Sequence, residues 1–107
     1  MRCLDFATGD LKWEGGTFSD SGSCIMTTDN RIIVWGGRGR LALVDTADRS
    51  PTTYHELASI DNVFSTDVWP HVALANGRLF CKDRDGNMAC FESYDPAVGA
   101  AEEKDAP

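Results

Sequence analysis

The sequence predicts an all-β protein made of antiparallel strands, and three observations support this fold class. Short apolar runs alternate with turn residues at nearly even intervals, and no stretch keeps a helical period over an adequate length. Asn76-Gly77 and Asp85-Gly86 lie between alternating runs, a pattern typical of two-residue hairpin turns with positive φ. The chain also repeats itself, because a shift of 47 residues lays 30–34 on 77–81 and 39–45 on 86–92. A period of this size indicates stacked supersecondary units.

The first unit of the repeat is expected to hold two strands, at 2–6 and 11–14. Ala7-Thr8-Gly9 forms the turn between them, because glycine and small polar residues favour tight turns. A polar loop rich in glycine and serine follows at 17–22. Residues 1–14 are therefore predicted to form part of a four-stranded unit.

The second unit is expected to be complete and to span 23–59. Asp29-Asn30 predicts a tight turn after its first strand, and Gly36-Gly37-Arg38-Gly39 turns the chain again after the second. The Arg49-Ser50-Pro51 break separates the third strand from a β-prone fourth strand. The strands are predicted at 24–28, 32–35, 41–45 and 52–58.

The third unit, 69–92, is expected to be partial. Trp69-Pro70 is interpreted as an edge entry into the inner strand of this unit, with an exposed recognition aromatic as the alternative, and His71 is interpreted as a structural residue rather than a ligand. The strands are predicted at 71–75, 79–82 and 88–91. Residues 95–107 have no apolar period and many small or acidic residues, which predicts a disordered acidic tail.

The short connections make every strand pairing antiparallel. Four-stranded up-and-down sheets repeated in series are the blades of a β-propeller. Residues 1–94 are therefore predicted to form about two blades of an incomplete propeller or of a propeller fragment. A closed ring of this class needs about 4 to 8 blades, so missing blades or further copies of the chain are expected to complete it.

Composition limits the classes of partner. The chain has 107 residues, with 10 basic and 17 acidic residues and a net charge of −7, which disfavours nucleic-acid binding. Its apolar runs are too short to span a bilayer, so no membrane span is predicted. No signal peptide is recognised, because Arg2 to Asp5 is already strand-like, and we expect the natural N-terminus to lie upstream.

The potential metal-ligating residues show no recognised spacing. The cysteines are far apart, no CxxC occurs, and the histidines add no zinc pattern; these residues are Cys3, Cys24, Cys81, Cys90, His55 and His71. No metal ligand is predicted among them.

One motif carries a family resemblance. Cys3 to Trp13 follows the pattern AxDxxTGxxxW, with Cys3 in place of the alanine. Asp5 can cap the turn, Gly9 supplies a backbone geometry that other residues resist, and Trp13 projects from the outer strand. The motif resembles the tryptophan-docking repeat of pyrroloquinoline-quinone (PQQ)-like β-propellers. The resemblance implies that Asp5, Thr8, Gly9 and Trp13 dock one blade to the next, with the indole N–H bonded to a main-chain carbonyl.

The resemblance covers about residues 2 to 92 and weakens along the chain. The second unit reads Thr46-Ala47-Asp48-Arg49 where the motif has its Thr-Gly, and the third unit ends before that point. Degenerate last units favour the C-terminal end of a propeller. Family habit implies a periplasmic or cell-surface location.

The family includes enzymes, but this chain is not expected to be one by itself. Quinoprotein dehydrogenases of the family hold PQQ against a ring of two adjacent half-cystines and bind a calcium ion with carboxylates. No adjacent cysteines occur here, and the acidic residues are scattered over turns. No catalytic, cofactor-binding or metal-binding residue is predicted, and PQQ and calcium are expected only if the parent protein is a true quinoprotein.

Cys81 and Cys90 leave two alternatives open. If Asp85-Gly86 is a two-residue loop, Cys81 lies opposite Cys90 in a non-hydrogen-bonded pair, where a disulfide is possible. The repeat favours reduced core residues instead, because Val34 and Leu43 hold the equivalent positions.

The leading functional hypothesis is a non-catalytic propeller segment that serves as a scaffold or binds protein partners. The alternative is the C-terminal part of a PQQ-dependent oxidoreductase whose cofactor site lies in missing blades. An extracytoplasmic sensor domain is a third hypothesis. All three rest on analogy of fold.

Overall fold

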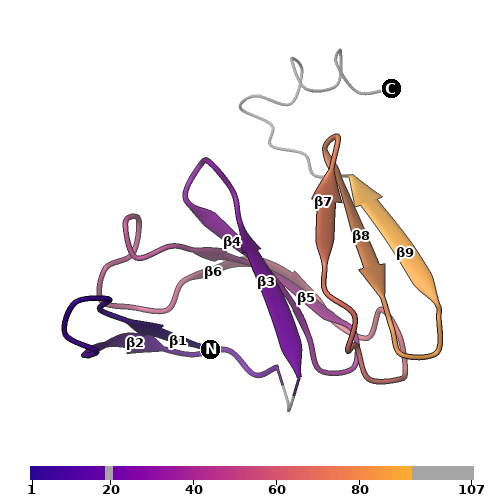
Figure 1. Cartoon of the computed structure of the whole chain (residues 1–107), viewed down its shortest axis with the longest axis horizontal. Coiled ribbons are helices and arrows are strands. Elements are labelled where there is room, and N and C mark those ends of the chain that lie inside the picture. The colour runs from indigo at the N-terminus through magenta and orange to yellow at the C-terminus, as the bar shows by residue number, and fades with distance from the viewer. Residues whose placement is uncertain (19–20, 93–107) are drawn as a thin grey trace.

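The computed structural model describes residues 1–18 and 21–92 of the chain. In these residues the protein is all-β and contains no helix, as the sequence predicts (Figure 1). Its strands are β1 Arg2–Leu4, β2 Leu11–Glu14, β3 Gly22–Met26, β4 Arg31–Gly36, β5 Arg40–Asp45, β6 Glu56–Ile60, β7 Ala73–Ala75, β8 Arg78–Lys82 and β9 Met88–Glu92. The tail predicted at 95–107 lies outside the described residues.

The strands form three antiparallel sheets in chain order. The first sheet is β1-β2, the middle sheet is β3-β4-β5-β6, and the third sheet is β7-β8-β9. Figure 1 shows the middle sheet between the other two. The grouping into two, four and three strands agrees with the units predicted from the repeat.

Both faces of the middle sheet are covered, because its central strands are apolar at odd and at even positions. On β4, Ile33 and Trp35 point to the third sheet, where they pack with Leu79 and Cys81. Val34 points the other way and packs with Trp13 of the first sheet. A strand buried on both faces reads as a continuous apolar run rather than as an alternating one, which explains the Ile32-Ile33-Val34-Trp35 sequence.

The segment 61–72 connects the middle and third sheets and fastens their hairpin loops together. The amides of Val63 and Val68 donate to the carbonyls of Gly39 and Gly37, and the Arg84 amide donates to the Asp67 carbonyl. Val68 and Val72 are only 1% and 2% exposed. This segment therefore closes one end of the space between the two sheets.

The hairpin loops follow the repeat closely. Gly36 pairs with Arg40 in the middle sheet, and Lys82 pairs with Met88 in the third sheet. Gly39 has a φ of 90°, and Gly86, which lies 47 residues later, has a φ of 92°. Both loops therefore place glycine in the same left-handed conformation.

Asp83 fixes the loop that Gly86 completes. Its side chain is 1% exposed, and it accepts hydrogen bonds from the Asp85 and Asn87 amides, from Asn87 Nδ2 and from Thr66 Oγ1. Burial alone raises the pKa of Asp83, but the bonds from Thr66 and Asn87 outweigh it and lower the pKa below its usual value. The bonds to Asp85 and Asn87 hold the hairpin turn in place, and the bond from Thr66 joins the turn to the 61–72 segment.

The first and last predicted strands of the middle sheet are displaced. The first is β3, which spans Gly22–Met26 rather than the predicted 24–28. It ends at Met26 because its hairpin loop is longer than Asp29-Asn30: the Thr27 amide already donates to the Arg31 carbonyl. The fourth begins at Glu56 rather than at 52, because the Ser50 hydroxyl donates to the Thr53 carbonyl and 51–53 bend.

Candidate interaction surface

The four predicted docking residues lie on the first hairpin, and three of them build its turn. Asp5 Oδ1 accepts hydrogen bonds from the amides of Ala7 at 2.9 Å and Thr8 at 3.0 Å. These bonds, with that from Thr8 foremost, lower the pKa of Asp5. Thr8 Oγ1 accepts from the Asp10 amide at 3.2 Å, and Gly9 has a φ of 78°. The motif residues therefore form a local capped turn of the kind their chemistry predicts.

Trp13, the fourth docking residue, joins the first sheet to the middle sheet. It is 5% exposed, packs with Val34 and Val44, and meets the Tyr54 ring edge to face at a centroid distance of 5.6 Å. Its Nε1 has no hydrogen-bond acceptor among the described residues. The expected packing of the indole against a neighbouring sheet is therefore present, and the expected bond to a main-chain carbonyl is not.

Trp35 carries the bond that sequence reasoning assigned to Trp13. Its side chain is 0% exposed, its Nε1 donates to the Lys82 carbonyl at 3.2 Å, and its ring meets Phe64 edge to face. Donor and acceptor are 47 residues apart, so the bond joins equivalent positions of two successive repeats. The sequence signal for this role is an aromatic residue at the end of a strand that is apolar on both faces. The repeat does not reveal it, because the position 47 residues later is a lysine.

The structure contradicts the predicted opposition of Cys81 and Cys90. Cys81 lies opposite Ala89, and Cys90 lies opposite Phe80. The loop is 84–86 rather than Asp85-Gly86, because the Asp83 amide donates to the Asn87 carbonyl. This one-residue change of register places the two cysteines on opposite faces of the third sheet.

The four cysteines are free thiols in different surroundings. Cys81 is 0% exposed and takes the expected core role, while Cys90 is exposed and does not. Burial, with a smaller contribution from Cys90, raises the pKa of Cys81 to about 11. Cys24 is exposed, and Cys3 is half-buried against Trp13.

At protein concentrations low enough for a monomer, we expect Cys24 and Cys90 to be alkylated rapidly in the native protein and Cys81 to be protected, because alkylation requires both a thiolate and access to it. The measurement is mass spectrometry of peptides after a short iodoacetamide pulse at neutral pH. A second sample is labelled in denaturant without reductant, where all four cysteines should react. Two unreactive cysteines in that sample would restore the disulfide alternative.

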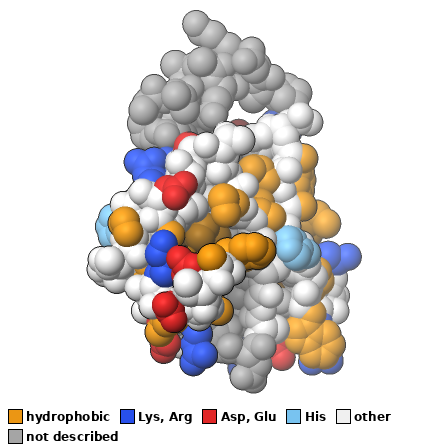
Figure 2. Space-filling model, turned by 60° about the vertical axis from the view of Figure 1, so that its left-hand side comes forward, with side chains coloured by type: hydrophobic (Ala, Val, Ile, Leu, Met, Phe, Trp, Pro, Cys, Tyr) orange, Lys and Arg blue, Asp and Glu red, His pale blue; other side chains and the backbone are white. Residues whose placement is uncertain are grey.

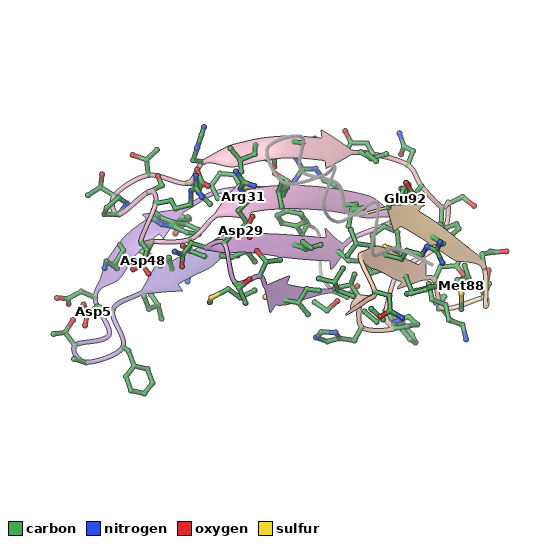
Figure 3. The ribbon with its side chains drawn as sticks, turned by 90° about the horizontal axis from the view of Figure 1, so that it is seen from above. Asp5, Asp29, Arg31, Asp48, Met88 and Glu92 are labelled. Atoms are coloured by element: carbon green, nitrogen blue, oxygen red, sulfur yellow. The ribbon has the colours of Figure 1, made fainter. Side chains whose placement is uncertain are left out.

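The side of the third sheet away from the middle sheet is partly apolar and uncovered. Because side chains alternate along a strand, the positions that face away from Leu79 and Cys81 share one face. We call them the outer third face: Ala73, Ala75, Arg78, Phe80, Lys82, Met88, Cys90 and Glu92. All but the half-buried Arg78 and Phe80 are exposed, and Met88 is 62% exposed. Figure 3 labels Met88 and Glu92 at the two ends of β9.

The opposite end of the stack has a second uncovered apolar pair. Leu4 and Leu11 lie directly opposite each other on β1 and β2 and are 56% and 54% exposed. An ion pair between Arg2 and Glu14 at 3.3 Å lies at the other end of the same hairpin. We call these four residues the outer first face. Figure 2, in which this side of the molecule comes forward, shows uncovered hydrophobic side chains beside charged ones.

Charged networks fasten the edges of the middle sheet. Arg40 donates from Nη2 to both carboxylate oxygens of Glu56, at 2.8 and 3.0 Å, and the Tyr54 hydroxyl donates to Oε1 at 2.8 Å. Burial, followed by this bond to Glu56, raises the pKa of Tyr54 to about 12. At the sheet end, Asp45 contacts His55 at 2.6 Å and Arg49 at 3.4 Å. All these contacts link residues within one unit, so they serve its folding.

Trp69 lies on the surface beside the loops rather than at the start of a strand. It is 63% exposed, β7 begins only at Ala73, and the Arg84 guanidinium stacks over its ring at 4.3 Å. The strand predicted at 71–75 begins two residues later, at Ala73, because the 61–72 segment must first cross between the two sheets.

Over the part of the chain that the structure describes, no group of three or more His, Cys, Asp or Glu side chains is placed to hold a metal ion. The same residues include no helix suited to crossing a bilayer. No protein-family model, no curated protein and no solved structure matches the chain.

Proposed function

We propose that the chain is a non-catalytic, propeller-type module that acts as a scaffold by packing the outer faces of its end sheets against other β-sheets. The observation that carries the proposal is the contrast between covered and uncovered faces. The middle sheet has a sheet on each side, whereas the outer first face and the outer third face have none among the described residues. Uncovered apolar faces rimmed by charge are typical of interaction sites.

The seams inside the chain indicate what such a face binds. At both contacts between sheets, aliphatic and aromatic side chains of the strands are packed together with those of neighbouring loops, and each contact includes one buried tryptophan from the lower-numbered sheet. Burial of apolar surface contributes about 25 cal/mol per Å², so a face of this kind gains most from a partner that also presents apolar strand residues. A β-sheet surface is such a partner.

The alternative, a terminal part of a PQQ-dependent oxidoreductase, stays a prediction of the resemblance. The periplasmic or cell-surface location is likewise a prediction of the resemblance. Neither is required for the binding function proposed here, which depends only on the faces of the stack.

The proposal is tested with an apolar fluorescent dye and three variants at protein concentrations low enough for a monomer. Leu4→Glu and Met88→Glu should each reduce the fluorescence of bound anilinonaphthalene sulfonate, because each places a negative charge on one outer face. Ile60→Glu is the matched control, since Ile60 is 47% exposed at the end of β6, outside both faces.

Dye fluorescence at the background of a fully polar protein, unchanged in all three variants, would contradict the proposed binding function. Equilibrium dialysis with PQQ and calcium tests the alternative in parallel. Saturable quinone binding by the intact chain would favour the oxidoreductase over the scaffold.

A further inference from the structure

The outer third face corresponds by the repeat to a face that is already covered. Phe80, Met88 and Cys90 lie 47 residues after Ile33, Leu41 and Leu43. Those three residues belong to the cluster between the middle and third sheets, with Leu43 at its margin. The face that each sheet turns toward the next sheet in the chain is therefore the packed face, and in the third sheet this face is uncovered.

The stack has a direction, because unlike faces meet at each seam. The first sheet turns Trp13 toward one face of the middle sheet, and the middle sheet turns Trp35 from its other face toward the third. The outer third face continues this series at one end, and the outer first face precedes it at the other. Figure 1 shows the first and third sheets on opposite sides of the middle sheet.

We infer that the partner of the outer third face is a second copy of this chain, which packs head to tail through its outer first face. The inference rests on the proposed function and names its partner. Leu4 and Leu11 of one copy lie over Phe80, Met88 and Cys90 of the next, which covers both uncovered apolar faces with a single contact. The repeat gives the direction of this pairing, because the outer third face corresponds to the face that the middle sheet turns toward the next sheet in the chain.

A head-to-tail contact is heterologous, so it produces a ring if the rotation between copies closes and a filament if it does not. Each chain has a net charge of −7, so like chains repel one another at long range. Raising the ionic strength from about 0.01 M to 0.15 M shortens the Debye length from about 30 Å to about 8 Å and should strengthen the association.

Two variants separate this arrangement from a symmetric one. Leu4→Glu damages the outer first face and leaves the outer third face intact, and Met88→Glu does the reverse; the two introduced carboxylates repel each other, so the two damaged faces cannot pair in a mixture. Both side chains are more than half exposed, so both variants should fold, which circular dichroism and thermal unfolding check. Sedimentation velocity is measured over a range of concentrations for each variant alone and for an equimolar mixture.

Wild-type protein should form species larger than a dimer, and each variant alone should associate at least about tenfold more weakly. The mixture should give a one-to-one dimer and nothing longer, because it contains one intact pair of unlike faces. Ile60→Glu should associate like the wild type.

Any other pattern overturns the inference. Dimers of Leu4→Glu alone would mean that two outer third faces meet, and dimers of Met88→Glu alone would mean that two outer first faces meet. A wild-type chain that stays monomeric at all concentrations also overturns it. If that monomer still binds the dye at the two faces, the proposed function stands with a different partner, so the two failures are distinguishable.

Discussion

Replacing Trp35 with alanine should destabilise the protein by about 3–5 kcal/mol, the usual range for truncating a fully buried aromatic residue. The indole is 0% exposed and lies between the middle and third sheets. Its loss removes packing against Phe64 and leaves the Lys82 carbonyl without its donor. Because small domains have about 5–15 kcal/mol of stability in total, a large part of it is lost. Chemical denaturation followed by circular dichroism measures the change.

A pair of phenylalanine variants separates the hydrogen bond from the packing. Trp35→Phe removes the bond to Lys82 as well as ring volume, while Trp13→Phe removes ring volume and no hydrogen bond. We expect Trp35→Phe to be the more destabilising by about 1 kcal/mol. If the alanine variant costs less than about 1 kcal/mol, the third sheet is not held by Trp35 and the described seam is wrong.

Replacing Gly39 with alanine is the second large effect, at about 3 kcal/mol or more. Gly39 has a φ of 90°, where a side chain is strained, and an added Cβ would lie 2.5 Å from the amide nitrogen of Phe64. That neighbour is backbone of the segment that crosses between the two sheets, and the Val63 amide also donates to the Gly39 carbonyl. The loop and the crossing segment must therefore move apart.

Gly86 is the matched control, supplied by the repeat itself. It has a φ of 92°, but an added Cβ meets no atom within 4 Å. Gly86→Ala should therefore cost only the conformational strain, about 1–2 kcal/mol. Denaturation of both variants under the same conditions gives the difference. Equal effects would show that the contact between Gly39 and the crossing segment has no energetic role.

Much of the fold could be predicted from the sequence because turn chemistry and apolar alternation are local. The repeat aligned β4 with β8 and β5 with β9, and it aligned Gly39 with Gly86, whose φ angles differ by only two degrees. The capped turn at Asp5 could also be anticipated, since all its hydrogen bonds lie within 5–10.

The remaining features depend on contacts between units, which a local pattern does not encode. The register of Cys81 and Cys90 is set by Asp83, whose burial under Thr66 depends on the crossing segment. Trp35 has no aromatic equivalent in the next unit, so its bond to Lys82 could not be inferred from the repeat. The docking pattern pointed to Trp13, and that indole packs between sheets as expected but bonds to no carbonyl.

The candidate surface was predicted only in outline. Self-association was expected from the small number of strands, but which side chains form the faces depends on register. A two-residue loop at Asp85-Gly86 would have turned Met88 and Cys90 toward the middle sheet. The actual loop turns them outward, opposite Lys82 and Phe80. The side chains that the third sheet exposes on its outer face therefore depend on Asp83 and on the length of the hairpin loop that it holds.

The 61–72 segment fastens the middle and third sheets together at one end and, among the described residues, leaves the other end of the space between them without such a connection. Hydrogen bonds from Val63, Val68 and Arg84 fasten the loop end, while the β3–β4 and β7–β8 turns diverge at the far end (Figure 1). We therefore expect the two sheets to separate by rotating about the fastened loop end. On partial unfolding, we expect solvent to enter the core between the two sheets from the end that has no such hydrogen bonds within 1–18 and 21–92. Trp35, near the fastened loop end, should be the last contact to open.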